Sequence, residues 1–262
     1  MKILFFGDVV GQPGRQAIKK ILPQWQKKYS PDFVIANADN LAHGKGVTEN
    51  TLNELLEVGI DLFTSGDHIW SKKEQAVKLL ENKEVPLIRP ANMSKNLSGQ
   101  GYHILKLRTK KILVINLIGK VFAKEEYDNP FKKVDQILDL EDDNFNAIII
   151  DFHAEATAEK INMGWYLDGK VSAILGTHTH IPTADAKILP KGTAYITDVG
   201  MVGPIDSSLG ADKQRALEML TNETPFRYKV ATGPVEVNAV LVEIGKNKKS
   251  KSIELLQETV AF

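Results

Sequence analysis

The feature that most constrains the fold is a series of short, unbroken apolar runs, each of which ends in polar or charged residues. Five of these runs are Ile3–Phe6, Phe33–Ala36, Leu62–Thr64, Ile148–Phe152 and Ile174–Leu175. Apolar runs of this length, without polar alternation, are typical of strands that are covered on both faces. The chain therefore needs other layers on both sides of any sheet that these strands form.

Helical patterns separate these strands. Apolar residues spaced by three and four within 16–29 predict a helix, and so do those within 48–58 and 72–80. Thr48 is the expected cap of the second helix, and Gly11–Gly14 is expected to form a turn before the first. The alternation of strand and helix predicts an α/β layered fold with short crossovers.

The second half of the chain is less regular, but strand and helix patterns are also found there. A hairpin is expected from 102–107 and 112–117, and the basic stretch Lys246–Lys251 is expected to be a solvated hairpin loop. Further helices are predicted at 129–140 and 155–164, and further strands at 147–152, 171–175, 192–197, 235–244 and 251–256. Because neither a repeat nor a low-complexity linker divides the sequence, residues 1–262 are predicted to form a single domain.

Composition excludes several classes of function. The 33 Lys and Arg residues balance 33 Asp and Glu residues, so no basic field favours nucleic acid or an anionic membrane. The absence of cysteine leaves carboxylate, imidazole, amide and carbonyl groups as metal ligands, which suit Mn, Fe, Zn or Mg. The apolar run at the beginning of the sequence is too short for a signal peptide. No apolar stretch approaches the roughly 20 residues that span a bilayer. A cytoplasmic location is expected.

Polar residues that can bind metals follow the five apolar runs. Sites in open α/β sheets form outside the carboxyl ends of strands, so these residues are expected to converge. Three aspartates and three histidines would repel one another without cations, whereas two divalent ions turn them into a stable site. The residues are Asp8, Asp39 with Asn40, Asp67 with His68, His153, His178 and His180.

Each of these residues has an ordinary explanation when it is considered alone. Asp8 could cap a turn or helix, Asp39 and Asn40 could form an Asx turn, and His153 could be a hydrogen-bonded histidine at the edge of the core. The combination favours a metal site, because four of the six histidines of the chain lie at strand ends with the aspartates. His178 and His180, two apart in an extended segment, project to the same side.

The motifs around these residues resemble those of a known superfamily. Gly7-Asp8, Asp39-Asn40, Gly66–His68, His153 and Gly176–His180 are similar, in order, to the blocks of the calcineurin-like metallophosphoesterases. The flanking segments resemble the bacterial YmdB-type branch from the first residues to about Gly210, and more loosely to the end. These segments are Gly7–Arg15, Ala42–Gly46, Arg89–Asn92, Asp151–Thr157 and Tyr195–Met201.

The resemblance implies an α/β fold of four layers, an αββα sandwich with two mixed β-sheets, around two divalent metal ions. Iron or manganese is implied, with zinc or magnesium also compatible with the donors. The implied activity is a phosphodiesterase acting on small phosphate esters, with 2′,3′-cyclic nucleotides as the substrates of this branch. Many members are homo-oligomers, and no stable binding to nucleic acid or membrane is expected.

Roles follow from the resemblance by position. Asp8 and His180 are expected to bind one metal, and Asp67, His153 and His178 the other, while Asp39 bridges them. Asn40 is expected to hold the first metal or the phosphate, and His68 to face the substrate as general acid. Two ions about 3.5–4 Å apart would then supply a bridging hydroxide for attack.

Two positions depart from the branch, which usually has Glu at position 39 and Asn at position 67. The shorter Asp39 is expected to reposition the metal pair rather than abolish it. Asp67 adds a third carboxylate, which should weaken the pull of the metals on the bridging water and move the activity optimum to higher pH.

Other functions stay open at this point. The same metals could serve a phosphomonoesterase or nucleotidase, or the chain could be a weakly catalytic, metal-stabilised regulatory or RNA-binding protein. Amidohydrolases also use a His-x-His pair, but place it on the first barrel strand. Arg15, His43 and Lys45 could contact phosphate or simply be solvated loop charges, and Asp198 is expected to shape a turn near the site.

Overall fold

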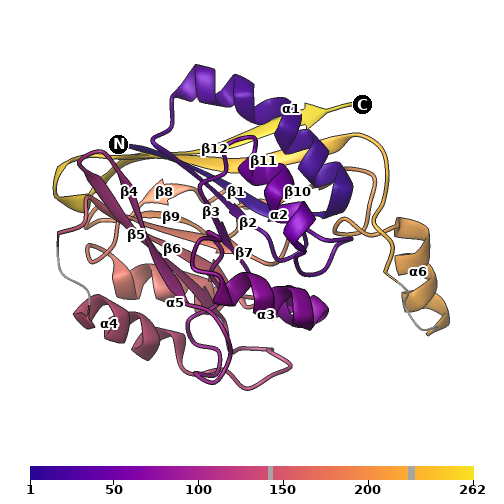
Figure 1. Cartoon of the computed structure of the whole chain (residues 1–262), viewed down its shortest axis with the longest axis horizontal. Coiled ribbons are helices and arrows are strands. Elements are labelled where there is room, and N and C mark those ends of the chain that lie inside the picture. The colour runs from indigo at the N-terminus through magenta and orange to yellow at the C-terminus, as the bar shows by residue number, and fades with distance from the viewer. Residues whose placement is uncertain (141–143, 224–227) are drawn as a thin grey trace.

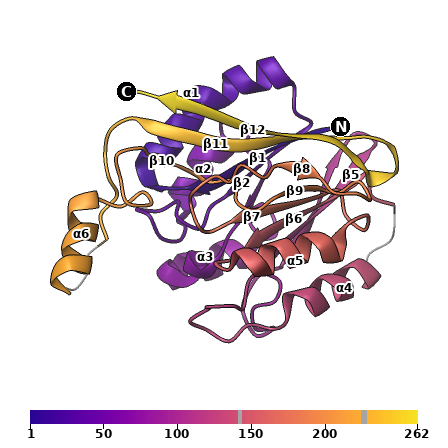
Figure 2. The ribbon, with the colours of Figure 1, turned by 180° about the vertical axis from the view of Figure 1, so that it is seen from behind.

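The structure is a computed structural model that describes residues 1–140, 144–223 and 228–262. Within these ranges, two six-stranded sheets face each other, as Figures 1 and 2 show from opposite sides. The first sheet has the order β12-β11-β10-β1-β2-β3 and the second the order β4-β5-β6-β7-β9-β8.

Both sheets are mixed, as predicted. In the first sheet β10, β1, β2 and β3 are parallel, β11 is antiparallel to β1 and β10, and β12 pairs antiparallel with β11 at the edge. In the second sheet β5, β6, β7 and β9 are parallel, with β4 and β8 antiparallel at the two edges. The strands are β1 (Lys2–Val9), β2 (Phe33–Asn37), β3 (Leu62–Thr64), β4 (Tyr102–Leu107), β5 (Lys110–Ile118), β6 (Ala147–His153), β7 (Ala173–Thr177), β8 (Lys187–Ile188), β9 (Ala194–Ile196), β10 (Met201–Pro204), β11 (Val235–Ile244) and β12 (Ser250–Val260).

Helices cover the outer face of each sheet, which completes the four layers of the predicted αββα sandwich. The helices are α1 (Gly11–Tyr29), α2 (Glu49–Leu56), α3 (Lys73–Glu81), α4 (Pro130–Leu140), α5 (Thr157–Leu167) and α6 (Lys213–Asn222). The first three pack on the first sheet, and α4 and α5 on the second (Figures 1 and 2). None of the helices in the described ranges has the length and apolar character that crossing a membrane requires.

The alternation of side chains along β1 shows how the layers are joined. Ile3 and Phe5 belong to the apolar core between the two sheets, while Leu4 and Phe6 point to the other face and belong to the core beneath α1. All four are fully buried, because successive side chains of a strand point to opposite faces. The unbroken apolar runs of the sequence therefore mark strands that are covered on both sides.

Three local predictions can be compared with the structure. Thr48 caps α2 as expected, and its side chain forms a capping box with Thr51. Gly11–Gly14 does not form the predicted turn, because α1 already begins at Gly11. Pro13 lies in the first turn of that helix, where a missing N–H has no helical partner to lose.

The region after Lys187 contains one helix that the sequence patterns did not predict. Short β-like runs were expected there, whereas α6 begins after Asp212, whose side chain accepts a hydrogen bond from the N–H of Arg215 at 3.1 Å. Only Ala216 of this helix is buried, so α6 lacks the apolar stripe by which a helix is usually recognised. The basic stretch near Lys246 forms the expected link between β11 and β12.

Candidate metal centre

The predicted site residues meet at the carboxyl ends of five parallel strands. The first sheet supplies the carboxylates, from the ends of β1, β2 and β3, and the second sheet supplies the imidazoles, from the ends of β6 and β7. Asp67 is the first residue of a short 3₁₀ helix, η1 (Asp67–Lys72), that follows β3 directly. The convergence that the strand-end rule predicts is therefore present.

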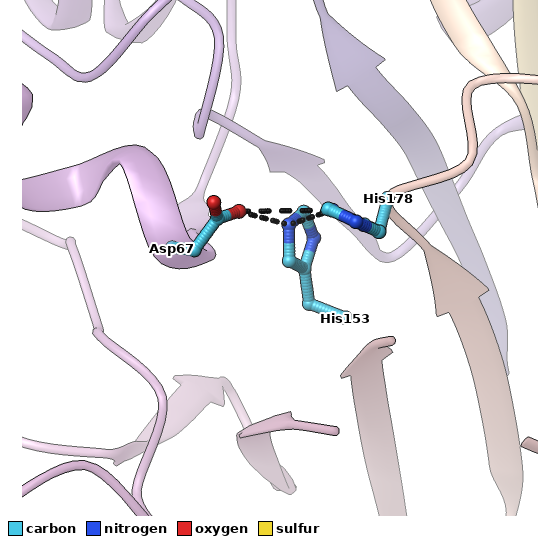
Figure 3. A group of neighbouring side chains, drawn as sticks. All are labelled: Asp67, His153 and His178. Carbon is cyan, nitrogen blue, oxygen red and sulfur yellow. Dashed lines mark hydrogen bonds and ion pairs between the residues drawn. The ribbon is translucent and has the colours of Figure 1, made fainter. Parts of the chain in front are cut away.

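One group of donors comprises Asp67, His153 and His178. Figure 3 shows these three side chains pointing toward one another from η1 and from the ends of β6 and β7. Nδ1 of His178 lies 3.0 Å from Nε2 of His153, and Oδ1 of Asp67 lies 3.4 Å from that same Nε2. One ligand atom from each residue lies within 4.8 Å of the others, which is close enough for a single ion to bind all three.

A second part of the cluster lies beside the first. Oδ1 of Asp8 is 3.7 Å from Nδ1 of His153 and 3.9 Å from Nε2 of His180, and this Nε2 is 3.3 Å from Oδ1 of Asn40. Oδ2 of Asp39 lies 3.6 Å from Nε2 of His153. Asp39 therefore lies at the junction between the two parts of the cluster.

Asp39 also organises the loop that carries the neighbouring donors. Its Oδ1 accepts a hydrogen bond from the N–H of Gly66 at 2.6 Å, and its Oδ2 accepts one from the N–H of His68 at 3.0 Å. Asp39, Asp67 and His68 form a further group whose ligand atoms lie within 4.8 Å. The ring of His68 is thus close to the metal donors, with its Nδ1 3.2 Å from Oδ2 of Asp67.

Burial makes the carboxylates of the cluster hard to ionise without cations. Burial, followed by the nearby charge of Asp198, raises the pKa of Asp8 to about 7. Burial and the charge of Asp67 raise the pKa of Asp39 well above its ordinary value. For Asp67, burial acts in the same direction, but the hydrogen bond and charge of His153 bring its pKa below the ordinary value. Divalent cations would relieve the repulsion among these groups.

Burial favours the neutral, metal-binding form of two proposed ligands. It lowers the pKa of His153 to about 3 and also lowers the pKa of His180. Burial lowers the pKa of His68 as well, against the opposing charge of Asp67. Because metal binding requires deprotonated donors, the imidazoles of His153 and His180 are ready to bind a cation.

An orphaned oxygen tests whether the donors fit metal ions. Among the described residues, Oδ1 of Asp8 is buried and accepts no hydrogen bond, an arrangement that is costly for a carboxylate. Oδ2 of the same residue accepts a hydrogen bond from the N–H of His178 at 3.0 Å. The free oxygen faces the imidazoles of His153 and His180, and oxygen with imidazole donors suits manganese, iron or zinc. The residues therefore fit a pair of such ions.

A buried chain of hydrogen bonds orients His153. Thr177 donates its hydroxyl hydrogen to Oδ1 of Asp151 at 2.7 Å, so its oxygen accepts from Nδ1 of His153, 2.9 Å away. Asn37, from the other sheet, donates to Oδ2 of Asp151 at 2.9 Å. The hydrogen of His153 is thus on Nδ1 and the lone pair of Nε2 points at Asp67 and His178. The patterns of the sequence gave Asp151 no role of its own, since it lies inside a strand.

A buried ion pair supports the loop that carries His178 and His180. Nζ of Lys160, on α5, lies 2.6 Å from Oδ2 of Asp198 and donates to the carbonyl of Thr177 at 2.7 Å. Oδ2 of Asp198 also accepts hydrogen bonds from the N–H and the hydroxyl of Thr179. Asp198 therefore contacts the loop, and the backbone of His178 and His180 has φ of 97° and 67°, values that non-glycine residues seldom adopt.

Arg15, His43 and Lys45, which could either contact phosphate or be solvated loop charges, occupy different surroundings. Arg15 is buried, and it donates to the carbonyl of Leu41 at 2.7 Å and to Glu54 at 3.1 Å. It supports the loop after β2 and does not line the cavity described below. His43 and Lys45 are exposed on that loop.

A cavity of about 370 Å³ opens over the donors. Its polar wall contains Asp39, Asn40, His68, Glu155, His178 and His180. Glu155 lies 3.0 Å from Nε2 of His178, on the side of the ring away from His153. Other lining residues are apolar and make up the apolar wall, namely Leu209, Ala216, Met219, Leu220 and Tyr228. Sequence reasoning missed this wall because α6 was not predicted.

Comparison with known proteins agrees with the motifs. A model of the YmdB-like protein family matches residues 4–256. The "2',3'-cyclic-nucleotide 2'-phosphodiesterase" of Bacillus subtilis strain 168 is 46% identical over 256 residues, which is 97% of this chain and 96% of that protein.

Solved structures show the same fold. A phosphatase from Mycoplasma pneumoniae has a TM-score of 0.93 at 36% identity, covering 100% of this chain and 94% of that one. The NAD nucleotidase of Haemophilus influenzae has a TM-score of 0.63 at 14% identity, covering 100% of this chain and 50% of that one, and shares the fold alone. The chain belongs to the YmdB-like family.

Proposed function

We propose that this chain is a phosphodiesterase that binds two divalent metal ions and hydrolyses 2′,3′-cyclic nucleotides. The observation that carries the proposal is the convergence of three aspartates and three histidines, of which Asp39, His178 and His180 line one cavity. The high identity to a Bacillus subtilis enzyme named for this reaction supports the substrate class. Iron or manganese fits the carboxylate and imidazole donors best.

The proposed ligands fall into two sets. Asp8, His180 and Asn40 hold the first ion, while Asp67, His153 and His178 hold the second. Asp39 would be shared by the two ions, since it lies 3.6 Å from His153 of the second set and the charge of Asp8 of the first set acts on its carboxylate. When bound, such ions stabilise the charge on a phosphoryl group and acidify a water molecule.

His68 is proposed to protonate the leaving oxygen. Its Nδ1 is paired with Asp67, so Nε2 is the nitrogen available to the substrate, and His68 lines the cavity. As water adds to phosphorus and the bond to the ribose oxygen breaks, the proton of Nε2 passes to that oxygen and a hydroxyl forms. The nearby charge of Asp67 favours the protonated ring that this step needs, against the burial that lowers the pKa of His68.

The remaining proposals concern the setting of the enzyme. The substrate is a small nucleotide or phosphate ester rather than a nucleic acid, and residues 1–262 act as a single domain in the cytoplasm, with homo-oligomers as in many relatives. A phosphomonoesterase is the second candidate, because a Mycoplasma pneumoniae structure of the same fold is named a phosphatase.

Turnover and metal content together test the proposal. We expect the purified protein with Mn²⁺ to hydrolyse 2′,3′-cyclic AMP faster than 3′-AMP or 5′-AMP, and to lose this activity in chelator. His153→Ala should lose bound metal and turnover, whereas His103→Ala, in β4 of the same sheet, should keep both. Absence of metal binding, or a preference for the monoesters, would refute the proposed phosphodiesterase activity.

The role of His68 has its own test. His68→Ala should lower turnover by about 10²–10⁴-fold while bound Mn²⁺, measured by elemental analysis, stays at the wild-type level. Loss of the metal in this variant would instead make His68 a ligand, as its place in the group with Asp39 and Asp67 also allows.

A further inference from the structure

The cavity over the metal donors has two walls of different chemistry. The polar wall carries the donors, and the apolar wall comes mainly from α6, which stands out from the body of the protein in Figures 1 and 2. Leu220 is 73% exposed and Met219 is half-buried. Both nevertheless line the cavity, so their apolar surface faces the space next to the donors.

The segment before α6 ties this apolar wall to the metal site. The carbonyl oxygen of Leu209 lies 3.0 Å from Nδ1 of His180, so one residue both fixes a proposed metal ligand and contributes to the wall. The N–H of Asp212, the cap of α6, donates to the carbonyl of Lys229 at 2.8 Å. These contacts hold the base of α6 at a defined place relative to His180.

Tyr228 closes the wall from the other side. Its ring packs so closely on Gly44 that a Cβ at this glycine would lie 2.1 Å from Cε1 of the ring, and Gly44 has a φ of +89°. The carbonyl of Gly44 accepts a hydrogen bond from Nδ2 of Asn40 at 3.0 Å. The wall is thus joined to the polar side of the site at Asn40 as well as at His180.

A ligand that fills this cavity needs an anionic group at one end and a flat apolar body at the other. The metal donors select the anionic group, and the aliphatic and thioether side chains of Leu209, Met219 and Leu220 can cover an apolar ring. A nucleoside phosphate has both parts in one molecule. One small ligand can contact the metal donors and the apolar wall at the same time, because both border the same cavity.

We propose that the apolar wall formed by Leu209, Ala216, Met219, Leu220 and Tyr228 binds the nucleobase of the substrate. This inference rests on the proposed phosphodiesterase function and adds the determinant of its substrate preference. The wall rewards the presence of a base but discriminates weakly between bases, since four of its five side chains are Leu, Ala or Met and offer no hydrogen bonds, and only the hydroxyl of Tyr228 could contact a base edge. Apolar contact alone gives weak discrimination, whereas matched hydrogen bonds give strong discrimination.

The test compares substrates with and without a base. Wild-type protein with Mn²⁺ should hydrolyse the four nucleoside 2′,3′-cyclic phosphates with kcat/KM values within about tenfold of one another, and each much better than glycerol 1,2-cyclic phosphate. In the double variant Met219→Ala/Leu220→Ala, kcat/KM for the nucleotides should fall about tenfold through KM. Its activity on the glycerol compound should not change.

Leu217→Ala is the matched control. Leu217 lies on the same helix and is 55% exposed, but does not line the cavity, so this variant should behave as wild type with every substrate. Equal losses on nucleotide and glycerol substrates in the double variant would overturn the base-binding role. A changed oligomer size in gel filtration with an unchanged substrate ratio would also overturn it, by making α6 a contact for a second copy of the chain.

Failure of the proposed function gives a different result. In that case neither cyclic substrate is turned over by the wild-type protein with Mn²⁺. Calorimetry would then compare the binding of 3′-AMP with that of inorganic phosphate. If the wild-type protein binds 3′-AMP more tightly than phosphate, and Met219→Ala/Leu220→Ala loses this difference, the result supports base binding by the apolar wall. Equal affinity of the wild-type protein for the two ligands overturns it.

Discussion

Lys160→Met removes one partner of a fully buried ion pair and leaves the other charged. Lys160 and Asp198 are 1% and 0% exposed, and methionine keeps most of the volume and the helix preference of lysine. Breaking a buried pair by removing one partner costs about 3–5 kcal/mol, because an uncompensated charge remains. The carbonyl of Thr177 also loses its shorter hydrogen bond and keeps the one from the N–H of Ala154 at 3.4 Å. Three hydrogen bonds to Asp198, from Thr179 and Gly200, persist.

We therefore expect the free energy of unfolding to fall by about 3 kcal/mol, the lower end of that range. For a chain of this length, such a change lowers Tm by about 6–12 °C. The loop with His178 and His180 should also lose its support, so the affinity for Mn²⁺ should fall with the stability. Chemical denaturation of the metal-free protein, followed by circular dichroism, measures the first effect, and calorimetric titration with Mn²⁺ measures the second.

Two control variants distinguish the effect of breaking the buried ion pair from the general effect of removing a lysine. Lys170→Met removes a lysine whose Nζ lies 3.5 Å from Asp135 on the surface, and exposed pairs contribute about 0–1 kcal/mol. Lys160→Met combined with Asp198→Asn removes the stranded charge and should be more stable than Lys160→Met alone. If Lys160→Met costs no more than Lys170→Met, the reasoning about the buried pair is wrong.

Three further predictions concern the metal centre. In the metal-free protein, Asp8 and Asp151, whose pKa values burial raises to about 7, hold protons that the unfolded chain has lost, so their contribution to stability falls as pH rises from about 4 to 7. The buried His153 and His180 act in the opposite direction, because their lowered pKa values keep them neutral where the histidines of the unfolded chain are protonated. Thermal scans in chelator should therefore show the Tm of Asp8→Asn rising relative to that of the wild type from pH 4 to 7, and a constant difference would contradict the assignment. Thr177→Val should lower the affinity for Mn²⁺ by about 10–100-fold, because it removes the hydroxyl that orients His153. Thr177→Ser keeps this hydroxyl and should keep the wild-type affinity. Asp67→Asn should move the pH–rate profile toward acid, and an unmoved profile would show that the third carboxylate has no such effect.

Sequence reasoning succeeded where burial on both faces leaves an unmistakable pattern. Runs such as Ile3–Phe6 and Phe33–Ala36 contain no polar residue, so their strands, and the polar residues that follow them, could be located from the sequence. The positions of Asp8 and His153 followed from the rule that parallel strands end at the same edge. The meeting of these residues required no knowledge of individual contacts.

The parts that could not be predicted depend on contacts between distant segments. The turn expected at Gly11 is a helix start, whose N–H donates to the carbonyl of Asn40, and glycine with proline nearby more often marks a turn. Helix α6 has only Ala216 buried, so it lacks the periodic face that identifies helices. Asp151 and Lys160 lie within a strand and a helix, where nothing local shows that they support the histidines.

The division of donors between the sheets gives the metal site a second effect. The aspartates follow strands of the first sheet and the histidines follow strands of the second, so any ion bound by both kinds joins the two sheets at one edge. Without ions, that edge holds the unpartnered oxygen of Asp8 and is joined by hydrogen bonds such as those from Asn37 to Asp151 and from the N–H of His178 to Asp8. The apolar core between the sheets can form without metals, since Ile3, Phe5 and their neighbours are buried independently of the site. Metal binding should therefore stabilise a fold that already exists, and the added stability should concentrate at the edge where catalysis is proposed.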